Sequence, residues 1–124
     1  GIGAAIRRRF TIDGDTVVGL DLVDGLDVTD ADACVAACAE VVATHGRLDV
    51  LCNNAGIGIP TSSVNIKLDD WKWIIDVDLW GPIYGVKTFL PLIEEAGEGH
   101  INATSSMAVP GAMRSQRISS RKVS

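Results

Sequence analysis

The segment LDVLCNNAGIGIP, residues 48–60, restricts the possible folds of this chain more than any other stretch. It starts with the apolar character of a buried strand, and the strand then ends in Asn53 and Asn54. Side-chain amides are costly to bury unless something hydrogen-bonds them. Ala55 and Gly56 follow, and residues this small leave room for a flat ligand close to the backbone. We therefore expect a strand that ends at a binding site.

Strand-like and helix-like patterns alternate along the chain. The helical patterns cover residues 3–13, 30–46 and 68–95. The strand patterns cover residues 15–22, 26–30, 48–53 and 99–109. Because the strands are continuously apolar, the alternation predicts an α/β fold with a parallel sheet covered by helices on both faces.

Charge and cysteine content argue against several classes of protein. A net charge of −5 disfavours nucleic acid or an anionic membrane as the main partner, since either would favour a basic face. No apolar run approaches the roughly 18 residues that a membrane span needs. The 3 cysteines form no CxxC pair and indicate neither a disulfide framework nor a metal site. We expect a soluble cytoplasmic protein with no nucleic-acid, membrane or metal partner.

The residues that follow each strand carry the most information, because ligands of parallel sheets bind beyond the carboxyl ends of the strands. Gly1-Ile2-Gly3 leads into a helix, whose free N–H groups favour a phosphate. At the next strand end, Asp21 could accept hydrogen bonds from ribose hydroxyls and repel a 2′-phosphate, or be a solvated turn acid. Asp27 and Val28 could flank an adenine ring. The last strand ends in Thr104-Ser105-Ser106, whose hydroxyls suit a polar substrate group.

Five motifs, in this order, resemble those of the short-chain dehydrogenase/reductase (SDR) family along nearly the whole chain. They are GIG at residues 1–3, GLDL at 19–22, LDVTD at 26–30, NNAG at 53–56 and TSSMA at 104–108. The resemblance implies a Rossmann-like three-layer αβα doubly wound parallel sheet, of which this chain carries a part. It also implies an NAD(P)-dependent oxidoreductase that interconverts small alcohols and carbonyls, commonly as a homo-oligomer.

The resemblance also implies roles for single residues. Those implied to bind the cofactor are Gly1, Ile2, Gly3, Asp21, Asp27, Val28, Asn53, Asn54, Ala55 and Gly56. Ser106 matches the catalytic serine that holds the substrate oxygen, and Asp78 stands where the family usually has an Asn that helps to relay protons. Asp21 has no Arg or Lys directly after it, which suggests NAD over NADP.

The family's general acid/base, a tyrosine in a YxxxK motif, is missing. The only tyrosine, Tyr84, lies inside a helical pattern, whereas Ile118 stands in the tyrosine's place and Lys122 in the place of the catalytic lysine. Isoleucine has no proton to exchange, and acid/base assistance is worth about 10²–10⁴ in rate. We expect the chain alone to be inactive. The alternative is a non-catalytic dinucleotide-binding or oligomerisation module that uses residues 77–93 as a helical partner face.

The two ends of the chain differ from its middle. It opens on Gly-Ile-Gly without an initiator Met, from which we expect a fragment. The last eleven residues carry four positive charges and no acid. We predict a partial NAD(P)-binding Rossmann domain over residues 1–110 and a disordered or aberrant basic tail over residues 111–124.

Overall fold

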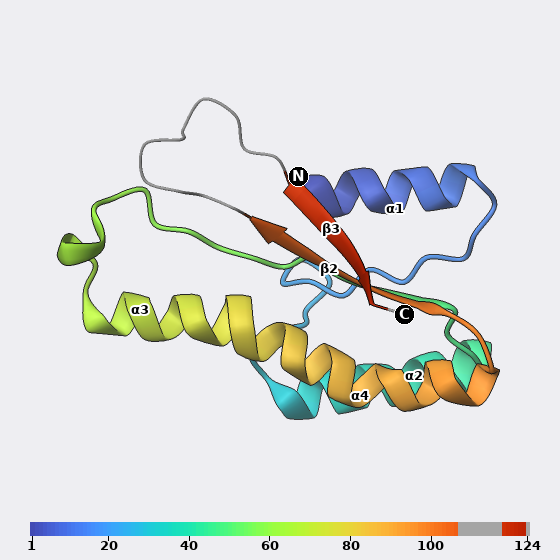
Figure 1. Ribbon diagram of the computed structural model, residues 1–124. Helices are drawn as coiled ribbons and strands as arrows, with labels where there is room; N and C mark the ends of the chain where they lie inside the picture. The colour runs from blue at the N-terminus through green and yellow to red at the C-terminus, as the bar shows by residue number, and fades with distance from the viewer. Residues whose placement is uncertain (107–117, 124) are drawn as a thin grey trace.

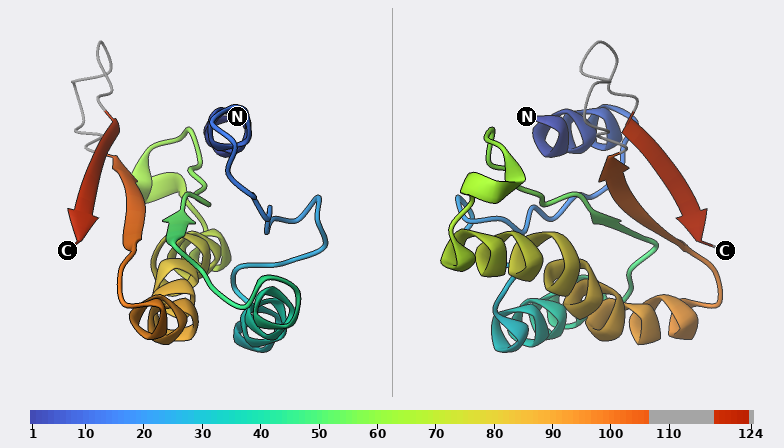
Figure 2. Two further views of the ribbon diagram at one scale, coloured as in Figure 1. Left: turned by 90° about the vertical axis from the view of Figure 1, so that its right-hand side faces the viewer. Right: turned by 60° about the vertical axis from the view of Figure 1, so that its left-hand side comes forward.

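The computed structural model describes residues 1–105 and the backbone of residues 106 and 118–123. Strands β1 (Val50–Asn53) and β2 (His100–Ser106) run parallel at the centre. Helix α1 (Ile2–Ile12) lies on one side of them, and α2 (Ala31–His45) and α4 (Gly81–Ala96) lie on the other (Figure 1, Figure 2). The chain therefore has a partial α/β fold with helices on both faces of its parallel strands, as the sequence predicts.

A third strand makes the sheet mixed rather than wholly parallel. Strand β3 (Ile118–Val123) pairs antiparallel with β2, in the sheet order β1-β2-β3. The register places Ile118 opposite Ser106 and Lys122 opposite Asn102. Of the predicted basic tail, residues 111–117 and 124 lie outside the described residues, as do residues 107–110 of the predicted domain.

The second helix begins and ends at the bounds of the helical pattern predicted over residues 30–46. The Asp30 carboxylate caps α2 by accepting a hydrogen bond from the Ala33 N–H at 3.0 Å. At the other end Gly46 has φ +73°, the left-handed conformation that glycine adopts without strain, and its N–H donates to the Val42 carbonyl. Both predicted ends of this helix are confirmed.

The predicted third helix is confirmed as a continuous helical segment with a change of winding. A short 3₁₀ turn, η1 (Ser63–Asn65), precedes α3 (Leu68–Ile75), which passes through a π-helical turn, η2 (Asp76–Trp80), into α4. Pro82 follows directly, and a proline has no N–H to donate to the preceding turn. The helical pattern over residues 68–95 is therefore interrupted by a widened turn just before Gly81 and Pro82. None of the described helices is both long and apolar enough to span a bilayer.

Two predicted strands, residues 15–22 and 26–30, are wrong. Residues 15–20 have no regular secondary structure and no partner strand among the described residues, and residues 21–30 lie in bends and turns. The Asp21 carboxylate accepts the backbone N–H groups of Val23 and Asp24, and the Asp21 carbonyl accepts that of Leu26. A strand needs a neighbour for its backbone hydrogen bonds, and here local turn bonds replace the ladder. Of the apolar residues in this region Leu26 is buried, whereas Val18 and Leu22 are exposed.

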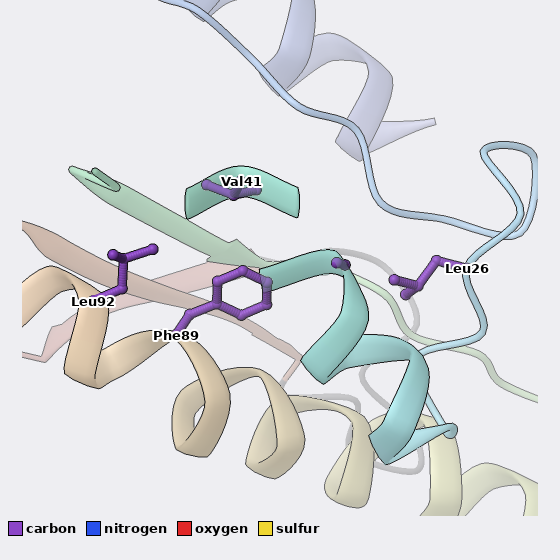
Figure 3. Close-up of a cluster of buried hydrophobic side chains, with 5 residues drawn as sticks. Leu26, Val41, Phe89 and Leu92 are labelled. Carbon is purple, nitrogen blue, oxygen red and sulfur yellow. The ribbon is translucent and has the colours of Figure 1, made fainter. Parts of the chain in front are cut away.

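The hydrophobic core lies between the sheet and the two helices below it (Figure 3). Its members come from the turn before α2, from α2 and from α4: Leu26, Ala37, Val41, Phe89 and Leu92. Phe89 is the most buried of them, with 4% of its surface exposed. All three tryptophans lie outside this core and are more than a third exposed. A small core thus fixes β1 over α2 and α4 and so positions the residues that follow β1.

Candidate functional site

The end of β1 is joined to β2 by a side-chain hydrogen bond. The Thr104 hydroxyl donates to Asn54 Oδ1 at 2.9 Å, and both residues are partly buried. One of the two amides that interrupt the strand therefore ties the two parallel strands together at their carboxyl ends.

The start of α1 lies against the same amide. A Cβ at Gly3 would come within 3.0 Å of Asn54 Nδ2, so a larger residue here would require the amide to shift. No side chain caps the helix start, and a Cβ at Gly1 would meet nothing within 4 Å. The start of α1 is thus uncapped and lies beside the strand end, an arrangement that favours a bound phosphate.

The other amide, that of Asn53, is partly unsatisfied. Its Nδ2 is buried and has no hydrogen-bond partner among the described residues. The side chain lies on α4 at Gly85, where an added Cβ would overlap Asn53 Oδ1 and come within 3.2 Å of Cγ. A buried donor without an acceptor is costly, and such groups often mark a site for a missing partner. The helical glycine at position 85 was the signal for this contact, and the sequence prediction missed it.

Asp78 holds the loop that follows the strand. It lies in the π-helical turn, and its Oδ1 accepts the Ile57 N–H at 2.8 Å. The same oxygen lies 3.6 Å from the position of a Cβ on Gly56. π-Helical turns occur often at functional sites. The structure thus brings Asp78 to the loop that contains Ala55 and Gly56.

The two acids predicted to bind the adenosine half lie in the turns that precede α2. One oxygen of Asp21 accepts two backbone N–H groups, at 2.7 and 3.1 Å. Asp27 Oδ1 accepts the N–H and the hydroxyl of Thr29, and these bonds lower the pKa of Asp27 below its usual value. Val28 packs on α4, 3.1 Å from the position of a Cβ on Gly81. Residues from both halves of the predicted site therefore contact the same helix.

The predicted catalytic residues are not brought together in the same way. Ser106 ends β2 and pairs with Ile118, while Lys122 pairs with Asn102, four residues before Ser106. Because a strand rises about 3.3 Å per residue, Lys122 lies about 13 Å along the sheet from the Ser106 position. Within the described part of the chain, no His, Cys, Asp or Glu side chains are grouped as metal ligands.

Sequence reasoning also missed an ion pair between α1 and the turn at Asp21. The Arg7 guanidinium lies 3.7 Å from the Asp24 carboxylate, and both groups pass over Gly19. The run of three arginines does not indicate which of them would lie against the turn at Asp21.

The residues at this edge fit a dinucleotide. The uncapped start of α1 suits a pyrophosphate, and the free oxygen of Asp21 suits a ribose hydroxyl. The unsatisfied Nδ2 of Asn53 lies at the end of β1, and Ala55 and Gly56 leave that edge exposed. Together they define a dinucleotide-binding α/β protein.

The particular family follows from comparison. Residues 1–119 match the short chain dehydrogenase family, and the chain belongs to that family. It is 36% identical over 111 residues to trans-4-hydroxycyclohexanecarboxylate dehydrogenase of Sinomonas cyclohexanicum, covering 88% of this chain and 43% of that protein. The predicted family and the Rossmann-type fold are thereby confirmed.

Solved structures give the same result. Aldohexose dehydrogenase of Thermoplasma acidophilum, in ligand-free form, matches with a TM-score of 0.83 and 30% identity over 91% of this chain and 49% of that one. A metagenomic short-chain oxidoreductase in complex with NADP matches with a TM-score of 0.66 and 32% identity, covering 88% and 49%. The chain spans about half the length of these relatives.

The bond between Asn54 and Thr104 gives a test of the strand tie. We expect Asn54→Ala and Thr104→Val to show a coupling of about 0.5–1.5 kcal/mol in a double-mutant cycle of urea unfolding, because each removes the same hydrogen bond. Asn54→Ala combined with Thr44→Val, at an exposed position of α2, is the control and should be additive within about 0.5 kcal/mol. Additivity of the first pair would show that the bond does not stabilise the sheet.

Proposed function

We propose that this chain binds NAD(H) as the cofactor half of an oxidoreductase that interconverts a small alcohol and its carbonyl. The unsatisfied Asn53 Nδ2 at the strand end carries the proposal, together with family membership. Asp21 supports NAD over NADP, because its carboxylate suits a 2′-hydroxyl and repels a phosphate. Two relatives are named for a hydroxycyclohexanecarboxylate and an aldohexose, which supports a hydroxyl-bearing substrate.

The chain's own residues divide the work at this site. Gly1, Ile2 and Gly3 hold the pyrophosphate at the start of α1, Asp21 the adenosine ribose, and Asp27 and Val28 the adenine. Asn53, Asn54, Ala55 and Gly56 line the channel toward the nicotinamide, and Asp78 keeps their loop in place.

The bound nicotinamide supplies or accepts the hydride. Ser106 holds the substrate oxygen, and Lys122 keeps the place of the catalytic lysine. With Ile118 in the tyrosine's place, proton exchange lacks its usual group, so turnover by this chain alone falls by about 10²–10⁴.

The wider assignments belong to the same proposal. Residues 1–110 form the cofactor domain, the full-length parent assembles as a homo-oligomer, and the protein works in the cytoplasm. The second candidate, a non-catalytic dinucleotide-binding or oligomerisation module, is favoured by Ile118 and by the exposed Trp73 and Trp80 on the α3 and α4 segment.

Titration of the chain with NADH tests the function. We expect NADH fluorescence to increase on binding, and Asn53→Ala to weaken binding by about 2- to 10-fold, the worth of one hydrogen bond. Asn65→Ala, in η1, is the matched control and should bind as the parent does. No NADH binding by a chain that melts cooperatively would overturn the proposal. Alcohol-dependent reduction of NAD would favour the enzyme over the module.

A further inference from the structure

Arg7 and Asp24 meet over a glycine beside the predicted ribose-binding acid. The Arg7 Nη1 lies 3.7 Å from Asp24 Oδ2. A Cβ at Gly19 would come within 2.5 Å of that Nη1 and 2.7 Å of that Oδ2, so the missing side chain makes room for the pair. The pair thus connects α1, at whose start the pyrophosphate is placed, with the turn that contains Asp21.

Asp24 contacts both charged neighbours at once. Its backbone N–H donates to Asp21 Oδ1 at 3.1 Å, while its side chain faces Arg7. Two carboxylates and one guanidinium therefore lie together at the place where the adenosine ribose is expected. The negative charges outnumber the positive charge, and this balance disfavours a 2′-phosphate.

The contact between Arg7 and Asp24 is weak. Its 3.7 Å separation is longer than a hydrogen bond, and the two side chains are 53% and 35% exposed. Exposed ion pairs contribute about 0–1 kcal/mol. A guanidinium binds a phosphate more strongly than it binds a carboxylate 3.7 Å away, because its planar fork can donate two parallel hydrogen bonds to the phosphate. Removal of the Asp24 charge therefore leaves Arg7 without this competing carboxylate.

We propose that Asp24 sets the cofactor preference by neutralising Arg7, and that removal of the Asp24 charge converts Arg7 into a binding group for the 2′-phosphate of NADP. The inference rests on the proposed cofactor site. Asp24 thus acts as a specificity-determining residue. It is not the ribose-binding acid predicted from the sequence, which is Asp21, and it lies outside the five family motifs. Its replacement by Asn keeps the backbone N–H that Asp21 accepts, so the turn at Asp21 stays intact.

The experiment compares two fragments of the cofactors, 5′-AMP and 2′,5′-ADP, by calorimetry. We expect Asp24→Asn to bind 2′,5′-ADP up to about fivefold more tightly, because an exposed ion pair that competes for Arg7 is worth at most about 1 kcal/mol, and 5′-AMP within about twofold of the unmodified chain. The double variant Arg7→Gln/Asp24→Asn should lose the gain. In fluorescence titrations, the affinity for NADPH should change among the variants as that for 2′,5′-ADP does, and the affinity for NADH should change as that for 5′-AMP does.

Asp13→Asn is the matched control, because Asp13 pairs with Arg9 at the other end of α1 and its replacement changes the net charge by the same amount. A similar gain in Asp13→Asn, or a gain that survives in the double variant, would overturn the inference. Unchanged 2′,5′-ADP binding by Asp24→Asn, with NADH binding retained, would overturn it and leave the proposed function standing. Failure of every folded variant to bind NADH and 5′-AMP would overturn both.

Discussion

Phe89→Ala is expected to lower the free energy of unfolding by about 3–5 kcal/mol, the usual cost of emptying a buried phenylalanine site. Phe89 is 4% exposed and packs between α2 and α4 against Val41 and Leu92 (Figure 3). The core contains few other large buried side chains that could compensate for the loss, and no described side chain is less than 2% exposed. Urea unfolding followed by tryptophan fluorescence measures this change in unfolding free energy. The tryptophans lie outside the core, so the substitution at Phe89 does not alter their surroundings in the folded state.

The control for this prediction is Val35→Ala, on the same helix α2 but 58% exposed. Surface changes of this kind stay within about 0.5 kcal/mol. If Phe89→Ala cost as little as Val35→Ala, the cluster around Phe89 would not be the core that holds the sheet on the helices.

Gly85→Val is expected to cost about 1–3 kcal/mol in unfolding free energy, as overpacking does, and to abolish most NADH binding. The new Cβ would overlap Asn53 Oδ1, so either the amide or α4 must move. Movement of Asn53 would take its unsatisfied Nδ2 out of the proposed channel. Urea unfolding and NADH fluorescence, measured on the same sample, test the two effects together.

Gly58→Val serves as its control, because a Cβ there meets nothing within 4 Å and the glycine has no positive φ. It should change unfolding by no more than about 0.5 kcal/mol. A Gly85→Val protein that binds NADH as the parent does would contradict the role given to Asn53.

Local signals were enough to predict the helices. The Asp30 cap and the left-handed Gly46 are decided within a few residues of chain, and both ends of α2 came out as predicted. Strands depend on a distant partner. Residues 15–22 have the β-branched composition of a strand, yet no described strand pairs with them, and the Asp21 carboxylate supplies the turn bonds instead. Composition therefore predicted neither the burial nor the backbone conformation of residues 15–22, since Val18 and Leu22 are exposed.

In the candidate site, too, local features could be predicted and contacts between distant segments could not. The motif NNAG was enough to predict a strand that ends in two amides, and the structure shows that Asn54 accepts a hydrogen bond from Thr104 of the neighbouring strand. The contacts of Asn53 with Gly85 and of Arg7 with Asp24 join segments that are 32 and 17 residues apart. Side-chain direction across such separations follows from tertiary packing, which a single sequence does not encode in a readable pattern.

Helix α4 has two glycines one turn apart, and each meets a different half of the site. Gly81 receives Val28 from the predicted adenine side, and Gly85 receives Asn53 from the predicted nicotinamide side. With a rise of about 1.5 Å per residue, the helix separates the two contacts by about 6 Å. The helix therefore fixes the spacing between Val28 and Asn53, two residues of the predicted site that lie 25 positions apart in the sequence.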